Sequence, residues 1–126
     1  MDFDIKVIKA SKYCYIKAVI GGVDIGEVCV DLNSEDDARF VKRYSGKFAK
    51  VVLVHTSEKY TRQGVASALL NKTIEVLNGY NLYLYVIPSK RNSRDKDKNQ
   101  LVSFYSKFGF VQTDDVLVTT MVRIVK

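Results

Sequence analysis

The sequence has no apolar run that approaches the roughly 20 residues needed to span a membrane. Its opening stretch, MDFDIKVIKA, lacks an apolar core of signal-peptide length and contains two aspartates. Internal repeats and low-complexity linkers are also missing. We therefore expect one soluble domain over residues 1–126, in the cytoplasm and without a membrane partner.

Residues that commonly bind metals or act as nucleophiles are scarce. The chain has two cysteines, Cys14 and Cys29, and one histidine, His55. Two cysteines in a cytosolic chain indicate free thiols, and no base or positive neighbour that would activate either one is evident. Cysteine, histidine and aspartate do not occur at metal-ligand spacing, so we predict no metal.

Basic residues outnumber acidic ones by 20 to 14, which gives a net charge of +6. An excess of this sign favours an acidic partner, such as nucleic acid, an acidic protein or a polyphosphate cofactor, although it also suits a surface that is merely soluble. Five of the cations lie in loop 89–98. This loop is either solvated or a surface that steers an acidic acceptor or contacts nucleic acid.

Hydrophobic patterns predict the order strand, hairpin, helix, strand, helix, strand, helix, strand. This order implies an α+β (mixed α/β) fold, with a mixed sheet and helices on its faces. The near-continuous apolar segment 48–56 indicates a central strand that is buried on both faces. The strands are expected at 3–9, 13–20, 23–31, 48–56, 82–87 and 116–125, and the helices at 34–45, 64–77 and 101–110.

The dipeptide Gly21-Gly22 is typical of a two-residue hairpin turn, and it sets a register that places Cys14 opposite Cys29. In that register Glu27 lies on the apolar face, where a desolvated carboxylate suits a general base. A slip of one residue, or an edge position, puts Glu27 in water instead. His55 is the second candidate base, because histidine exchanges protons near neutral pH, and is otherwise a core residue.

The segment KYTRQGVASALL (59–70) joins the predicted central strand to the helix that follows. Gly64, Ala66 and Ser67 are small, and small residues at a helix N-terminus let an anion approach the free backbone N–H groups. The helix dipole adds to that attraction. The same pattern is also typical of a tight turn beneath a closely packed helix.

Two segments, YTRQGVASALL (60–70) and FYSKFGF (104–110), together resemble motifs of the GCN5-related N-acetyltransferase (GNAT) superfamily. The first resembles its acyl-CoA-binding loop, in which Gly64 and Ala66 match and Thr61 replaces the usual Arg or Gln. The second resembles its late helix-to-strand motif. The resemblance implies a GNAT-like central mixed, mostly antiparallel sheet flanked by helices. The usual N-terminal helix pair would be reduced or missing, because residues 9–12 leave no room for it.

The resemblance also implies acetyl-CoA (coenzyme A) as the cofactor. Val54, His55 and Thr56 would offer backbone groups to the pantetheine arm. Tyr105 would protonate the leaving thiolate, unless it only packs in the core. Histone-type relatives often have a glutamate early in the central strand, where this chain has Lys50. The phosphates would lie on Arg62, Gln63, Gly64, Val65, Ala66 and Ser67, with Phe104 and Lys107 of the second motif also at the cofactor.

We therefore expect an N-acetyltransferase whose acceptor is a protein amine, because missing lid helices leave an open cleft. Glu27, His55 or water would remove the acceptor's proton. The chain also resembles small phage-borne acetyltransferases that modify host defence proteins, which would place it in the host cytoplasm. The alternative is a catalytically reduced GNAT-fold module that binds CoA, a partner protein or nucleic acid. The apolar strand 116–125 would pair across a homodimer, or the protein is a monomer.

Overall fold

The computed structural model describes residues 2–33, 46–88, 96–113 and 118–125. The expected helix 34–45 and most of the charged loop 89–98 lie outside the described residues. Within the described ranges, no helix is both long enough and apolar enough to cross a bilayer.

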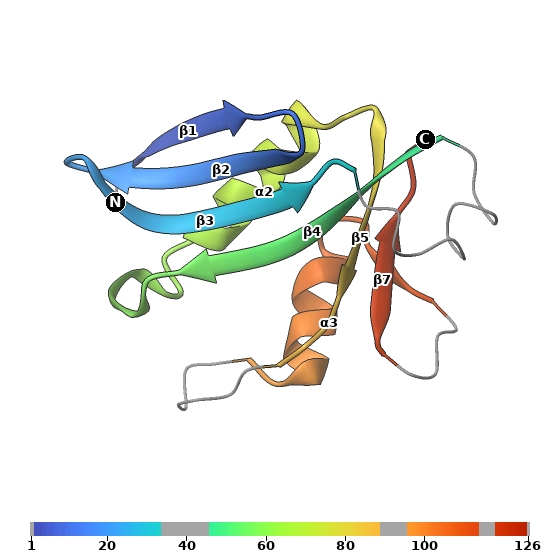
Figure 1. The fold of residues 1–126 in the computed structure, drawn as a ribbon. Helices are drawn as coiled ribbons and strands as arrows, with labels where there is room; N and C mark the ends of the chain where they lie inside the picture. Colours follow the sequence, from blue (N-terminus) through green and yellow to red (C-terminus); the bar gives the residue numbers. More distant parts are fainter. Residues whose placement is uncertain (1, 34–45, 89–95, 114–117, 126) are drawn as a thin grey trace.

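In the described part of the chain, seven strands form one sheet in the order β1-β2-β3-β4-β5-β7-β6 (Figure 1). Only β4 and β5 run parallel, and every other neighbouring pair among these strands is antiparallel. The mixed, mostly antiparallel sheet expected from the sequence is confirmed. The strands are β1 Asp4–Lys9, β2 Tyr13–Ile20, β3 Val23–Asp31, β4 Lys47–Thr56, β5 Tyr80–Tyr85, β6 Val111–Gln112 and β7 Thr120–Arg123.

Two α-helices pack on this sheet within the described residues. Helix α2 (Val65–Val76) is the crossover that parallel neighbours require, and it contacts β2, β3 and β4. Its buried side chains recur at helical spacing, and the Thr73 hydroxyl donates to the Leu69 carbonyl at 2.7 Å. Helix α3 (Lys98–Ser106) follows β5 and contacts β6. A short 3₁₀ turn, η1 (Glu58–Tyr60), lies between β4 and α2.

Hydrophobic clusters lie on both faces of the sheet. The main core joins both helices to inward residues of β4 and β5 such as Ala49 and Leu84. A smaller cluster of Phe48, Tyr83 and Val122 comes from the alternate positions of β4, β5 and β7, so it lies on the opposite face. The helices therefore cover one face, and the face of the smaller cluster has no described helix.

The connection between β1 and β2 is a tight turn. The Ala10 N–H donates to the Tyr13 carbonyl at 2.8 Å, so the chain reverses within a few residues. No helix lies between these strands, as expected from residues 9–12. The face opposite α2 therefore lacks a cover from this part of the chain.

The hairpin of β2 and β3 departs from the predicted register. Gly21 and Gly22 make the turn and Ile20 pairs with Val23 as expected, but a bulge interrupts the ladder between Val19 and Ala18. Beyond the bulge, the partners differ by one residue from those predicted. Cys14 pairs with Val30 and Cys29 with Tyr15, while Glu27 pairs with Lys17. The predicted pairing of the two cysteines is wrong, because one extra residue exchanges the faces of everything that follows.

Strand β4 is buried on both faces only at its start. It pairs with β5 from Lys47↔Tyr80 to Lys50↔Tyr83, and then the two strands separate (Figure 1). On its other edge β4 stays paired with β3 as far as Thr56. The β3–β4 ladder skips Val52, because its register shifts between Leu53 and Val51. Past the end of the β5 pairing and at this irregularity, Val52 and Leu53 are 45% and 43% exposed. The prediction of burial along the whole strand was wrong, because β5 accompanies β4 for less than half of its length.

The last strand is shorter than expected and is not at an edge. Strand β7 lies between β5 and β6, so both of its edges are paired. The two-residue strand β6 was not predicted. The idea that segment 116–125 pairs across a dimer through a free edge is therefore wrong for β7. Among the described strands, the edges of the sheet are β1 and β6.

Replacing Gly26 by alanine is expected to destabilise the protein by about 1–3 kcal/mol through overpacking. A Cβ at Gly26 would lie 2.9 Å from Val65 Cγ1 and 3.2 Å from the His55 carbonyl oxygen. Urea denaturation of Gly26→Ala would measure the loss. Gly79→Ala is the control, since its Cβ meets nothing within 4 Å and its φ is ordinary. Equal stabilities for the two variants would contradict the close approach of α2 to β3.

Candidate active site

The loop between β4 and α2 turns through two left-handed residues. Arg62 has φ 63° and Gly64 has φ 79°. Glycine adopts this conformation without strain, whereas Arg62 is the one described non-glycine residue that does so. Local strain of this kind is typical of sites that bind or react. The loop brings the chain from the end of β4 directly into the first turn of α2.

The N-terminus of α2 offers unpaired backbone donors. Its first N–H groups have no partner within the helix, and its N-cap is Gly64, which has no side chain to accept from them. A Cβ placed on Gly64 would meet nothing within 4 Å, so the space in front of these amides is open. The first turn of α2 also has no acidic residue. Together these features favour an anion at this helix end.

A buried hydroxyl lies at the end of β4 near the same place. Thr56 pairs with Gly26, and Gly26 is in close contact with Val65 at the start of α2. The Thr56 Oγ1 is buried and has no hydrogen-bond partner among the described residues. Leaving such a group unpaired is unfavourable, so this site has an unused donor and acceptor beside the helix end.

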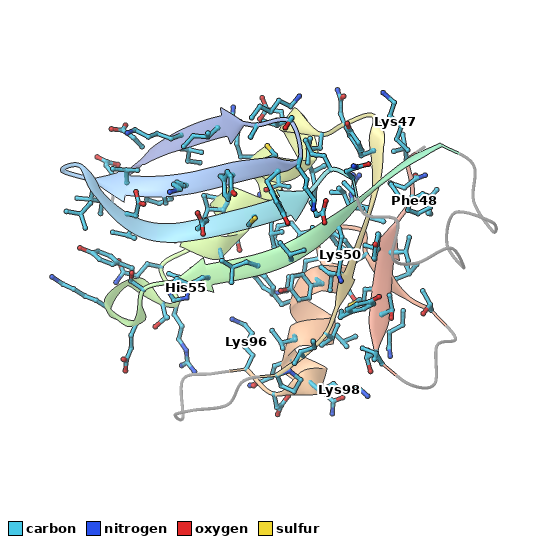
Figure 2. All side chains as sticks on the ribbon, in the orientation of Figure 1. Lys47, Phe48, Lys50, His55, Lys96 and Lys98 are labelled. Atoms are coloured by element: carbon cyan, nitrogen blue, oxygen red, sulfur yellow. The ribbon has the colours of Figure 1, made fainter. Side chains whose placement is uncertain are left out.

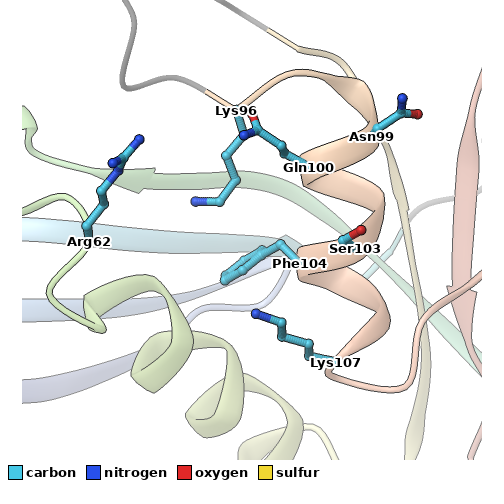
Figure 3. Close-up of a pocket in the computed structure, with 7 residues that line it drawn as sticks. All are labelled: Arg62, Lys96, Asn99, Gln100, Ser103, Phe104 and Lys107. Carbon is cyan, nitrogen blue, oxygen red and sulfur yellow. The ribbon is translucent and has the colours of Figure 1, made fainter.

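A surface pocket of about 450 Å³ separates this loop from α3 (Figure 3). Three of its lining residues are cations, Arg62, Lys96 and Lys107, and none is acidic. The ammonium of Lys96 lies 4.9 Å from the centre of the Phe104 ring. Figure 3 shows Arg62 on one side of the pocket and the α3 residues on the other. The remaining lining residues are Asn99, Gln100 and Ser103.

The structure brings together some of the residues that the sequence assigned to a cofactor. Arg62, Phe104 and Lys107 line the pocket, and Gly64 begins the helix beside it. The Gln63 side chain instead turns back on the loop, where its Nε2 donates to the Lys59 carbonyl at 3.4 Å. The backbone N–H groups of Val65, Ala66 and Ser67 lie in the first turn of α2.

Two pocket residues, Asn99 and Gln100, were missed because the sequence analysis began α3 too late. Helix α3 starts at Lys98, with Asp97 as its N-cap. The Asp97 carboxylate accepts from the Gln100 N–H at 2.8 Å, and the Gln100 side chain accepts from the Asp97 N–H at 2.9 Å. This capping box was visible as Asp-x-x-Gln ahead of an apolar segment. It would have placed Asn99 and Gln100 on the same helix as Ser103, with Lys96 just before it.

Tyr105 lies in the main core and is 9% exposed. Its ring packs edge-on against Phe104 and Phe110, with centroid distances of 5.4 Å and 6.0 Å. Burial raises the pKa of Tyr105 to about 12, so its hydroxyl keeps its proton at neutral pH. No described residue accepts a hydrogen bond from this hydroxyl. Tyr105 therefore has the protonation state of a proton donor.

The two candidate bases share a face of the sheet that is not the core face. Glu27 pairs with His55 across β3 and β4. Glu27 forms an ion pair with Lys17 at 3.6 Å and its side chain is 26% exposed, while His55 is exposed. The predicted placement of Glu27 on the apolar face is wrong, because the bulge between Ala18 and Val19 turns it toward water and a cation.

The cysteines are free and buried, as expected. Burial raises the pKa of both thiols, Cys14 and Cys29, which is the reverse of what a nucleophilic thiolate needs. Within the described residues, no group of three or more His, Cys, Asp and Glu side chains is close enough together to hold a metal ion.

The family of the chain follows from a match to a family model. Residues 2–110 match the model of the Acetyltransferase (GNAT) family. The chain therefore belongs to the GNAT family. A comparison with curated proteins found no match.

Solved structures of the same fold come from several acetyltransferases. PaiA N-acetyltransferase from Thermoplasma acidophilum, in complex with coenzyme A, is 20% identical with a TM-score of 0.58, over 89% of this chain and 60% of that one. NAA60 from Arabidopsis thaliana, with a bisubstrate analogue, is 15% identical with a TM-score of 0.67, over 93% and 78%. Tetrahymena GCN5 is 16% identical with a TM-score of 0.60, over 93% and 71%. At these identities the likeness establishes the fold alone, and this chain spans only 60% of the length of the PaiA protein.

Tyr105 is expected to make stability fall at alkaline pH. Because the pKa is raised from 10.0 to about 12 on folding, the folded state holds this proton more tightly than the unfolded state does. The contribution of the protonated Tyr105 hydroxyl to the free energy of unfolding is fully present below pH 10. It is lost as the pH rises through about 12. Urea denaturation at several alkaline pH values would measure it, as the difference between the wild type and Tyr105→Phe. A difference that does not change with pH would contradict the burial of this hydroxyl.

Proposed function

We propose that this protein transfers an acetyl group from acetyl-CoA to an amine of a protein. The observation that supports this most directly is the cationic pocket beside the glycine-capped start of α2, at the open ends of β4 and β5. Family membership supplies the class of reaction. The geometry of the loop and the pocket supports the phosphate site, whereas the role of Tyr105 rests on the family resemblance of FYSKFGF.

The phosphates of the cofactor would bind at the start of α2. The free N–H groups of Val65, Ala66 and Ser67 would donate to the pyrophosphate, and the helix dipole would favour its charge. Arg62 and Lys107, on opposite sides of the pocket, would add charge-assisted contacts, and Lys96 lies beside them. Polyphosphate is the ligand that such a group of donors and cations favours.

The pantetheine arm would follow the unpaired edge of β4. After Lys50 this edge loses its β5 partner, which leaves backbone groups along Val54, His55 and Thr56 for the amides of the arm. The contact between Gly26 and Val65 places this end of the strand next to the start of α2. The arm would therefore run from the phosphates toward the point where the two strands separate.

The reaction would be a direct acyl transfer. The neutral amine nitrogen attacks the thioester carbonyl, the N–C bond forms and the C–S bond breaks. The amine loses its extra proton to water, and the thiolate of CoA takes a proton from Tyr105, which is protonated again from water. Tyr105 is protonated at neutral pH, as any tyrosine is, and its burial, which raises the pKa to about 12, keeps the hydroxyl protonated.

Water is favoured over a dedicated base for the first proton transfer. Glu27 is engaged by Lys17, and the pairing of His55 with Glu27 places both at the phosphate end of β4. The acceptor amine would instead react at the far end of the arm. Among the described residues no helix covers the face opposite α2, and such a face favours a large acceptor, which is why a protein amine is proposed.

A catalytically reduced module that binds CoA without turnover is the second candidate. The ion pair of Glu27 with Lys17 supports it, because this pairing removes the first candidate base from the reaction. The acetyltransferase and the non-catalytic module would share the cofactor site. They differ because only the acetyltransferase has a rate of acetyl transfer that a change at Tyr105 would lower.

Acetyl-CoA is expected to raise the melting temperature by several degrees, whereas ATP should not. Ligand at 100 times its Kd adds about 2.7 kcal/mol of stability. Gly64→Asp should abolish the shift, because its carboxylate would compete with phosphate for the α2 amides. Gly22→Asp is a matched control, since Gly22 also has φ 79° and open space around it. Loss of the shift in both variants, or no shift in the wild type, would argue against this cofactor site.

Tyr105→Phe is expected to lower kcat by about 100-fold or more while acetyl-CoA still binds, because the leaving thiolate loses its proton donor. Turnover would be followed as thiol release with peptide acceptors, and binding as the thermal shift. Tyr80→Phe is the control, because Tyr80 packs beneath Lys47 at the start of β5. Unchanged turnover in Tyr105→Phe would leave this tyrosine a packing role only.

A further inference from the structure

Lys50 lies at the point where β4 and β5 separate. It is the last β4 residue paired with β5, opposite Tyr83. Phe48, Lys50 and Tyr83 belong to the face opposite α2, since Ala49 and Val51 point into the main core. Figure 2 shows Lys50 at this crossing of the strands, with His55 farther along β4. A molecule that enters the separation from the face opposite α2 therefore meets Lys50.

The ammonium of Lys50 has an aromatic neighbour and no counter-ion among the residues that the structure describes. Its Nζ lies 4.2 Å from the centre of the Tyr85 ring. Lys50 is half-buried, yet it forms no salt bridge with any carboxylate of the described residues. Its cross-strand neighbour Asp31 instead accepts a hydrogen bond from the Asn33 N–H at 2.9 Å. A partly desolvated cation in this position favours an anion from a ligand.

We propose that Lys50 selects the acceptor by binding a carboxylate close to the amine that is acetylated. This inference rests on the proposed acetyl transfer. The acceptor class is then an amine beside acidic groups, either a polypeptide with Asp or Glu next to the reacting residue or a free acidic amino acid. The Tyr85 ring holds the ammonium at the separation of the strands. Polyamines and lysine-rich peptides would be repelled by the same charge.

Matched acceptors test this assignment. The wild type would be assayed with peptides of one length that have Asp and Glu, Asn and Gln, or Lys beside the reacting amine, and with free glutamate. The acidic peptide is expected to exceed the amide peptide by about tenfold or more in kcat/KM, mainly through KM. If free glutamate is acetylated and the peptides are not, the carboxylate bound by Lys50 belongs to a free amino acid acceptor.

Variants on β4 separate the role of Lys50 from charge in general. Lys50→Met should remove the preference for the acidic acceptor, and Lys50→Glu should reverse it toward the lysine-rich peptide. Lys47→Glu is the control, because Lys47 also lies over a tyrosine ring, Tyr80 at 5.7 Å, but at the far end of the β4–β5 pairing. It should keep the wild-type preference. The KM for acetyl-CoA should be the same in all three variants.

The outcomes distinguish this inference from the function on which it rests. No preference by the wild type, or no turnover of any acceptor while acetyl-CoA still shifts the melting temperature, would overturn the role of Lys50 and leave the cofactor site standing. A preference that Lys47→Glu also abolishes would overturn it too. Failure of acetyl-CoA to bind would remove the proposed function and this inference together. The wild-type comparison needs no variant, so a variant that does not fold leaves the test intact.

Discussion

The loss of pairing between β4 and β5 after Lys50 and Tyr83 is the constraint on which the other features depend. Two parallel strands that stay together would bury their edges and leave no room between them. Here β4 continues on β3 alone, so its second edge is unpaired next to the start of α2. The start of α2, which has no side-chain cap, the unpaired edge of β4 and the pocket all adjoin this separation.

Positive charge is distributed on both faces of this separation. On the helix side, Arg62, Lys96 and Lys107 surround a pocket without an acidic lining residue. On the opposite side, Lys50 rests against Tyr85 without a described counter-ion. Charges of one sign at close range repel one another and destabilise the fold slightly, so such an arrangement is stabilised when anionic ligands bind. A polyphosphate would neutralise the three cations of the pocket, and a carboxylate would separately neutralise Lys50.

The connection between the first two strands is short. At this place the family resemblance implies a pair of helices in other members. The turn at Ala10 and Tyr13 connects β1 to β2 directly, and no described helix covers the face opposite α2. In the described part of the chain, the face opposite α2 is therefore formed mainly by the strands themselves. Strand residues are held rigidly by their ladders, so Lys50 and Tyr85 are positioned by backbone pairing and not by a mobile loop.

The sequence by itself determined the fold class, the family resemblance and the loop at Gly64, because periodicity, small residues at a helix start and the FYSKFGF segment are local patterns. Local capping chemistry at Asp97 and Gln100 was also present and was overlooked. The remaining features depend on tertiary contacts. A bulge between Ala18 and Val19 moved Glu27 to the outer face, and the separation of the strands exposed Val52 and Leu53. Register and strand divergence depend on contacts between distant segments, and a single sequence does not reveal those contacts.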